Sequence, residues 1–116
     1  MSATSRLEGT TTLVGIIGWP VSHTLSPRMH NAAFAALGLD WAYVPLPVDP
    51  ARVEDAVSGL VALGFAGANV TIPHKRAVIA CCDEVDEVAA RAGSVNTIVI
   101  REGRVLGSST DGLGAT

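Results

Sequence analysis

Short apolar runs alternate along the chain with stretches that have helical periodicity. The first run, at 13–17, ends at Gly18 and is typical of a strand buried on both faces of a sheet. Similar runs predict strands at 41–48, 65–70, 94–101 and 104–108. Apolar residues at helical spacing predict helices at 27–37, 50–63, 76–80 and 84–91. This order predicts an α/β fold, a three-layer sandwich with a mostly parallel sheet that carries an antiparallel hairpin strand.

Capping residues mark the ends of the first two helices. Ser26-Pro27 and Asp49-Pro50 each place an N-cap residue before a proline at the first helical position, and Gly38 and Gly64 are expected to end the two helices. The first helix carries an apolar stripe, the pattern of a face that packs against a core. The stripe comprises Met29, Ala32, Ala33, Ala36 and Leu37.

Two further signals concern the sheet. Pro45 and Pro47 fall within the predicted strand 41–48 and favour an edge position or an early end, because proline cannot donate to a strand ladder. Glu102-Gly103 separates the last two strands and predicts a two-residue hairpin turn.

The composition excludes several classes of protein. Apolar residues make up 48% of the 116 residues and charged residues 16%, which excludes a disordered tail and indicates one domain with a sizeable core. The net charge is −3 without a basic cluster, so neither nucleic acid nor an anionic membrane surface is an expected partner. No apolar run approaches the ~18–20 residues of a membrane span. Adjacent Cys81 and Cys82 suit neither a disulfide framework nor a zinc site, and favour reduced thiols in the cytoplasm.

The pattern divides the chain into three parts. Residues 1–12 are small and polar and lack the charged and then apolar stretches of a signal peptide. They predict a flexible N-terminal segment. Residues 13–111 predict one domain, and 112–116 begin a helical pattern that then stops. Because a domain rarely ends within such a signal, we expect these 116 residues to be a piece of a longer protein.

Four polar segments, which we place after apolar strands, are expected to meet at the edge of the sheet where strands end. They are 22–26, 69–75, 94–97 and 109–112. Their hydroxyls, amides, ammonium and carboxylate suit a small, hydroxylated, anionic ligand. Lys75 is the only lysine beside seven arginines, and it could exchange a proton with a carbonyl oxygen while Asp111 orients it. On these residues alone, an ordinary surface salt bridge between the two stays open.

Other chemistries find no support in the sequence. His23, His30 and His74 lack the spacing of metal ligands, and His30 is expected to be a structural histidine within a helix. A Gly-x-Ser-x-Gly nucleophile motif does not occur. Gly112-Leu-Gly114 predicts a helix start rather than a dinucleotide fingerprint.

Four motifs together resemble the shikimate dehydrogenase family. In chain order they are GWPVSHTLSPRMHN at 18–31, GANVTIPHK at 67–75, SVNT at 94–97 and STDG at 109–112. They have the family's order and spacing, and the resemblance covers the chain from about Leu13 onward. It implies the N-terminal, substrate-binding lobe of an enzyme that reduces 3-dehydroshikimate to shikimate with NADPH. That reaction is a step of aromatic amino-acid biosynthesis, in the chorismate pathway.

The resemblance also implies roles for single residues. The hydroxyls of Thr24 and Ser26 would hold the substrate carboxylate. Thr71, Asn96 and Asp111 would bind the ring hydroxyls.

Lys75 would be the catalytic lysine, paired with Asp111, and this role then outweighs the salt bridge. NADP would be bound mainly by a second lobe that is not within these 116 residues, and no metal is implied. Thr24 stands where the family commonly has serine, and Ser109 replaces the usual asparagine of its motif. A quinate or dual quinate/shikimate dehydrogenase lobe, and a stand-alone binder of cyclic hydroxy-acids, are the alternatives.

These 116 residues are expected to bind substrate without turning it over, because no lobe within them would hold the nicotinamide. Purified protein mixed with 3-dehydroshikimate and NADPH should therefore show no measurable loss of NADPH absorbance. A robust rate from pure material would contradict the expected division between two lobes.

Overall fold

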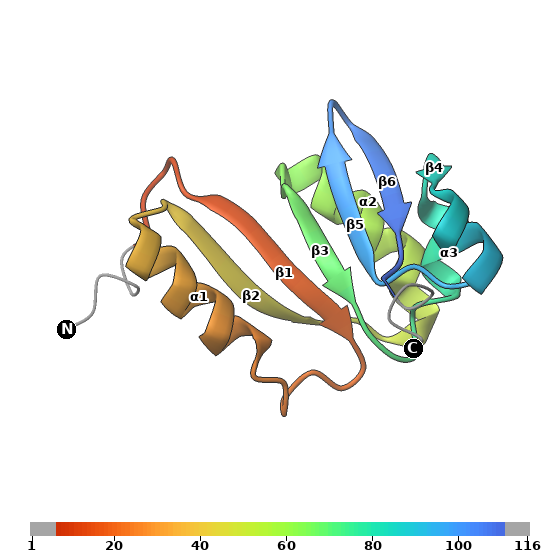
Figure 1. The fold of residues 1–116 in the computed structure, drawn as a ribbon, viewed down its shortest axis with the longest axis horizontal. Coiled ribbons are helices and arrows are strands. Elements are labelled where there is room, and N and C mark those ends of the chain that lie inside the picture. The colour runs from red at the N-terminus through yellow and green to blue at the C-terminus, as the bar shows by residue number, and fades with distance from the viewer. Residues whose placement is uncertain (1–6, 111–116) are drawn as a thin grey trace.

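The computed structural model describes residues 7–110, which form a six-stranded mixed sheet with helices on both faces (Figure 1). The strands follow the order β2-β1-β3-β5-β6-β4 across the sheet. Their bounds are Thr12–Gly18 for β1, Trp41–Pro47 for β2, Gly67–Val70 for β3, Glu84–Val85 for β4, Thr97–Arg101 for β5 and Arg104–Ser108 for β6.

One strand runs against the rest of the sheet. β1 pairs in parallel with β2 and β3, and β4 pairs in parallel with β6, whereas β5 is antiparallel to both of its neighbours, β3 and β6. The β5–β6 hairpin turns at Glu102 and Gly103, whose φ angles of 51° and 78° are those of a two-residue turn. The predicted parallel sheet with an antiparallel hairpin strand is confirmed.

Helices cover both faces of the sheet. The helix α1 (Ser26–Leu37) lies over β1 and β2, while α2 (Val53–Leu63) packs on the opposite face (Figure 1). The 3-10 helices η2 (Pro50–Arg52) and η3 (Ala77–Cys81) and the helix α3 (Glu87–Ala92) complete the fold. None of the helices in residues 7–110 reaches the length and hydropathy needed to cross a membrane.

The alternation of side chains along β3 explains why the core lies on the α2 face. Ala68 and Val70 are buried in the core with Val57 and Leu60 of α2, whereas Asn69 between them faces the α1 side. The fully buried centre of the core is made of aliphatic residues from several elements. They include Ile17, Val78, Val95 and Ile98.

The helix predicted at 84–91 is wrong in its first turn. Residues 84–85 are strand β4, which pairs with β6, and α3 begins only after Asp86. The Asp86 carboxylate accepts a hydrogen bond from the Ala89 amide at 2.8 Å, so this residue is the N-cap. Asp83 holds the chain beside β6, because its carboxylate accepts from the Val105 amide at 2.7 Å.

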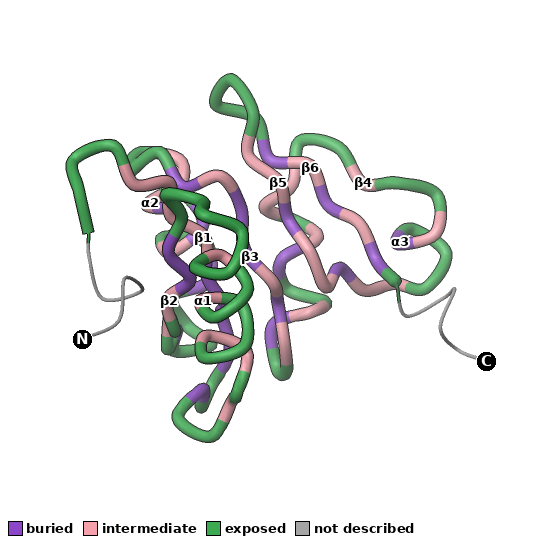
Figure 2. The backbone as a smooth tube through the Cα atoms, turned by 60° about the vertical axis from the view of Figure 1, so that its left-hand side comes forward, coloured by how far each residue is buried: buried purple, intermediate pink, exposed green. Residues whose placement is uncertain are grey.

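The N-terminus and outer face of α1 also differ from the expectation. The N-cap position is Leu25 rather than Ser26, and no side chain caps the helix. No residue of α1 is buried, and the predicted stripe faces outward: Met29 is 66% exposed and Leu37 72% exposed. Figure 2 shows α1 as exposed along most of its length. The half-buried residues of α1 are instead Ser26, Pro27, Asn31 and Phe34. Asn31 and His30 contact Tyr43 on β2.

Other boundaries follow the sequence more closely. Gly38 and Gly64 end α1 and α2 in the left-handed conformation, and β2 with its two prolines is an edge strand, as predicted. The strands predicted at 65–70 and 94–101 begin later, at Gly67 and Thr97. Next to β1, the hydroxyls of Thr10 and Thr11 donate to the Asp40 carboxylate and lower its pKa.

Two glycine substitutions should move stability in opposite directions. A Cβ on Gly67 would stand 2.4 Å from the Ile98 carbonyl oxygen in the β3–β5 pairing, so Gly67→Ala should lower the free energy of unfolding by about 1–3 kcal/mol. Gly59 lies in α2 with nothing within 4 Å of its Cβ position, and Gly59→Ala should raise that free energy by about 0.5–1 kcal/mol. Urea unfolding of both variants tests this, and equal effects would contradict the tight β3–β5 approach.

Candidate functional site

The predicted polar segments gather at one edge of the sheet. The carboxyl ends of β1, β3 and β6 lie there, and because β5 is antiparallel, its amino end lies there too. The segment 94–97 therefore reaches this edge by preceding β5, and the expectation that it follows a strand is wrong. The structure describes the edge as far as Thr110, so Asp111 lies outside the described residues.

The loop after β3 is held by backbone hydrogen bonds to the end of β1. The Thr71 amide donates to the Ile17 carbonyl at 2.9 Å, and the Trp19 amide donates to the Ile72 carbonyl at 3.2 Å. The Thr71 methyl also lies against Gly18, since a Cβ on that glycine would stand only 2.4 Å from it. Thr71 is thus fixed by its backbone and its methyl group, with its hydroxyl on the same edge.

Hydrogen bonds hold the backbone on both sides of Lys75 in the sequence. Before it, the His74 ring is buried, and its Nε2 lies 2.6 Å from the Val48 carbonyl oxygen at the end of β2. After it, the Lys75 carbonyl accepts from the Val95 amide at 2.8 Å. The backbone that carries the ammonium group is therefore anchored to β2 and to the segment before β5. No role for His74 could be assigned from the sequence, where its place beside Pro73 is only a weak signal of burial.

Asn96 joins three strands at this edge. Its carbonyl accepts from the Val70 amide at 2.8 Å, and its own amide donates to the Ser108 carbonyl at 3.0 Å. Its side chain binds Thr110: Nδ2 donates to Oγ1 at 2.7 Å, and the Thr110 amide donates to Oδ1 at 3.3 Å. Thr110 is the residue before Asp111 in the sequence.

Thr24 and Ser26 form the other polar group of the edge, before α1. The Ser26 amide donates to the Thr24 hydroxyl oxygen at 3.2 Å, and both residues are half-buried. Ser26 is the first residue of a 12-residue helix, whose dipole favours a negative charge at this end. Pro27 has no backbone N–H and the Ser26 N–H is bonded to Thr24, so the two hydroxyls are the main groups that could bind an anion here. Two hydroxyls at a helix N-terminus suit a carboxylate.

Asn31 clamps α1 to the sheet through the backbone of Tyr43. Its Nδ2 donates to the Tyr43 carbonyl at 2.9 Å, and its Oδ1 accepts from the Tyr43 amide at 2.8 Å. Tyr43 is on the edge strand β2, so these backbone groups have no second strand to bond. An asparagine inside a helix of apolar and small residues was the available signal, but only the structure shows its partner.

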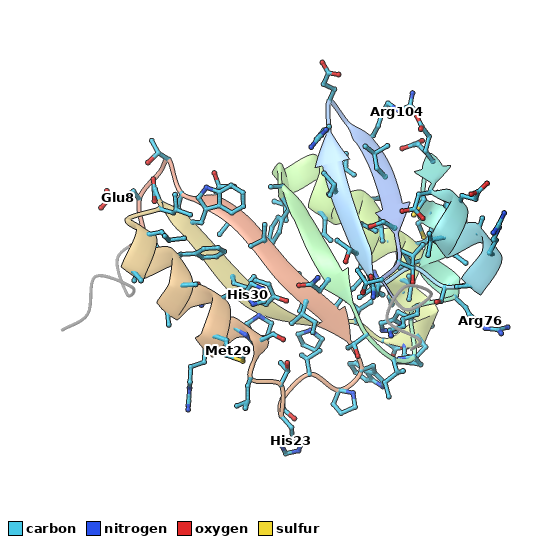
Figure 3. The ribbon with its side chains drawn as sticks, in the orientation of Figure 1. Glu8, His23, Met29, His30, Arg76 and Arg104 are labelled. Atoms are coloured by element: carbon cyan, nitrogen blue, oxygen red, sulfur yellow. The ribbon has the colours of Figure 1, made fainter. Side chains whose placement is uncertain are left out.

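Tyr43 itself was missed by sequence reasoning. It is buried, and burial raises the pKa of its phenol, while the nearby Ser26 hydroxyl lowers it. The His30 ring stacks on Tyr43 with centroids 4.2 Å apart, and His30 Nδ1 lies 3.0 Å from the Ser26 carbonyl oxygen. His30 is thus a partnered histidine on α1, whereas His23 points outward from the loop before α1 (Figure 3).

The described residues hold no group of three side chains arranged to bind a metal ion. Both cysteines are free thiols, and their pKa values are raised, mainly by burial. Raised pKa values keep these thiols protonated at neutral pH, so neither is an activated nucleophile.

Comparison with known proteins gives concordant matches. The family model described as the shikimate dehydrogenase substrate binding domain matches residues 16–98. An NADP+-dependent shikimate dehydrogenase of Rubrobacter xylanophilus is 58% identical over 110 residues, which are 94% of this chain and 39% of the relative.

Solved structures of similar fold carry related names. A crystal structure of a shikimate dehydrogenase in complex with NADP+ is 45% identical, with a TM-score of 0.90 over 95% of this chain and 38% of that one. A shikimate 5-dehydrogenase of Listeria monocytogenes, in complex with shikimate and NAD, is 41% identical with the same TM-score and coverage. This chain thus spans 38–39% of the length of these relatives.

The single tyrosine of the chain makes the raised pKa of Tyr43 directly measurable. Ultraviolet titration of the phenolate should give a native midpoint above 10.0, the ordinary pKa of the group, and a midpoint near 10.0 in denaturant. Because the folded-state pKa is raised, the stabilising contribution of the neutral phenol is complete below pH 10 and is lost as the pH rises through the folded value. A native midpoint at or below that of denatured protein would contradict the burial of this hydroxyl.

Proposed function

Because this chain belongs to the shikimate dehydrogenase family, as a substrate-binding domain of that family, we propose that it supplies the substrate site of an NADP-dependent enzyme that reduces 3-dehydroshikimate to shikimate. The observation that carries the proposal is that residues with three hydroxyl groups, one amide and one ammonium lie at a single edge of the sheet. They are Thr24, Ser26, Thr71, Asn96 and Lys75. Backbone hydrogen bonds hold Thr71, Lys75 and Asn96 there. The shikimate present in the similar structure from Listeria monocytogenes supports the choice of ligand.

The substrate carboxylate is assigned to Thr24 and Ser26. Their hydroxyls lie at the N-terminus of α1, where the helix dipole favours an anion. Thr24 keeps the hydroxyl of the serine common in the family and adds a methyl group, which narrows this side of the site.

The ring hydroxyls are assigned to Thr71, Asn96 and Asp111. A side-chain hydroxyl and an amide can each donate to or accept from an alcohol, which is the pairing that a hydroxylated ring requires. Asn96 reaches the edge from the amino end of β5 and Thr71 from the carboxyl end of β3. The Asp111 carboxylate is proposed on the sequence motif alone.

Lys75 is the proposed proton donor. Reduction of a ketone adds a hydride to the carbonyl carbon and a proton to its oxygen. NADPH supplies the hydride when it is bound. The Lys75 ammonium donates the proton to the oxygen as negative charge develops there, and recovers it in the reverse direction. Asp111, as the paired carboxylate, would orient the ammonium and offset its charge.

The residues described here do not fit the phosphate groups of NADP. A dinucleotide pyrophosphate binds where a glycine-rich turn leads from a strand into a helix. In residues 7–110, the turns before α1, α2 and α3 contain no glycine. We therefore assign NADP binding to a portion of the longer relatives that this chain does not span. The free thiols of Cys81 and Cys82 fit a reducing compartment, and we place the protein in the cytoplasm on that ground.

Binding of shikimate tests the proposal. In an amide-resolved NMR titration at millimolar ligand, shikimate should shift the signals of the residues at this edge. They are Thr24, Ser26, Thr71, Lys75 and Asn96. Thr71→Val, which keeps the methyl group against Gly18 and removes the hydroxyl, should weaken binding by about three- to tenfold, the usual effect of one hydrogen bond.

Thr71→Ser is the matched control, because it keeps the hydroxyl and removes the methyl group. Its affinity for shikimate should stay within about twofold of the parent protein. Shifts with quinate and none with shikimate, or shifts spread over α2 and α3, would contradict the proposed substrate site.

A further inference from the structure

Tyr43 occupies a position between the two polar groups of the site. It lies on β2 with its side chain on the α1 face of the sheet, and only 3% of the residue is exposed. The His30 ring covers its face, and Asn31 fixes its backbone. The ring lines an apolar groove of about 490 Å³ between α1 and β5, together with Val14, Phe34 and Trp41. A hydroxyl on a ring held this firmly has a defined direction.

The phenol begins a chain of hydrogen bonds that crosses the sheet. Tyr43 Oη donates to Asn69 Oδ1 at 2.7 Å, passing over β1 to reach β3. Asn69 Nδ2 in turn donates to Thr97 Oγ1 on β5, the residue paired with Asn69 across the strands. At 3.5 Å this second bond is the longest of the chain.

The same direction of donation continues to the sheet edge. Thr97 Oγ1 donates to Asn96 Oδ1 at 3.0 Å, and Asn96 Nδ2 donates to Thr110 Oγ1 at 2.7 Å. In this series of hydrogen bonds, the side-chain amides of Asn69 and Asn96 each accept on Oδ1 and donate from Nδ2. The phenol proton selects the orientation of the Asn69 amide, and the Thr97 hydroxyl then donates to Asn96 Oδ1, which also accepts from the Thr110 amide.

The phenol also lies near the other polar group. The nearby Ser26 hydroxyl lowers the pKa of the phenol, against the larger effect of burial, which raises it. Tyr43 thus lies near Ser26, which we assign to the substrate carboxylate, and begins the series of hydrogen bonds that leads to Asn96, which we assign to a ring hydroxyl.

We propose that Tyr43 is a positioning residue, whose hydroxyl orients the side-chain amide of Asn69 and, through Thr97, supports the orientation of the Asn96 amide. The inference rests on the proposed function for its effect on shikimate binding. The orientation of Asn96 is a property of the protein without ligand and can be measured separately. Removing the phenol proton leaves Asn69 Oδ1 without its donor, so the Asn69 amide loses the bond that selects its orientation. Thr97 then loses the fixed donor that turns its own hydroxyl toward Asn96 Oδ1.

The side-chain NH2 signals of the asparagines can report this orientation by NMR. The chain has three asparagines and no glutamine, so three pairs of side-chain NH2 signals report all its carboxamides. Tyr43→Phe keeps the ring, and with it the stacking on His30, and removes only the hydroxyl. The Asn69 and Asn96 signals should shift in this variant. The Asn31 signals should stay in place, because Asn31 binds the backbone of residue 43.

Shikimate affinity provides the second readout. Tyr43→Phe should raise the Kd by about three- to tenfold, since loss of the hydroxyl weakens the hydrogen bonds that help to hold the Asn96 side chain. Thr97→Val breaks the chain beyond Asn69 and should shift the Asn96 signals in the same way. Combining the two substitutions should weaken binding no more than the stronger single variant, because both act through Asn96. Ser58→Ala, on α2 at the opposite face, is the control and should change neither the asparagine signals nor the Kd.

Three results would overturn the proposal. One is an unchanged side-chain NH2 signal of Asn96 in Tyr43→Phe. This holds also if the Asn69 signal shifts, since the 3.5 Å bond from Asn69 to Thr97 would then fail to carry the change to Asn96. Another is an unchanged Kd, and a third is full additivity of the two substitutions. If the parent protein fails to bind shikimate at all, the proposed function fails, while the asparagine signals of the ligand-free protein still decide whether Tyr43 orients Asn96.

Discussion

The reversed direction of β5 is the constraint on which the candidate site depends. In a fully parallel sheet, the segment before a strand lies at the amino edge, far from the loops that follow other strands. Here β5 enters from the carboxyl edge, so the segment 94–97 faces the loop 71–75 directly. The tight β3–β5 approach at Gly67 keeps the two strands in this register. The topology of the sheet therefore brings the segments of the site together, and the side chains then determine its chemistry.

Main-chain bonds position the loops at this edge and leave the side chains for other partners. Thr71, Lys75 and Asn96 each use a backbone group to join a neighbouring strand or segment. His74 adds a buried side-chain contact to Val48, the residue that follows β2. The loop that carries Lys75 is therefore attached to β1, to the end of β2 and to the segment before β5. Such a loop presents its functional groups in a defined geometry before any ligand arrives, which reduces the entropy lost on binding.

Local backbone chemistry made much of the fold predictable. Glycines that end helices, prolines that limit an edge strand, and the Glu102-Gly103 turn act through the conformations of single residues, so the sequence alone contains the information. The strand β4 was mistaken for helix because it exists only through pairing with β6. The packed face of α1 was assigned incorrectly because bonds from Asn31 to β2, rather than apolar periodicity, decide it.

Motifs indicated the candidate site residues, but Tyr43 and His74 each bond to a group 26 positions away in the sequence and could not be found from spacing. The role of Asp111 stays a prediction.

The Asn31 clamp also affects how this molecule behaves beside its own copies. Along the exposed side of β2, the outward backbone groups belong to alternate residues, 41, 43, 45 and 47. Positions 45 and 47 are prolines and have no N–H to offer, and the N–H of Tyr43 is already bonded to Asn31. A strand from another molecule would find only the N–H of Trp41 along that border of the sheet. The residue that docks α1 thus also protects the sheet against edge-to-edge aggregation.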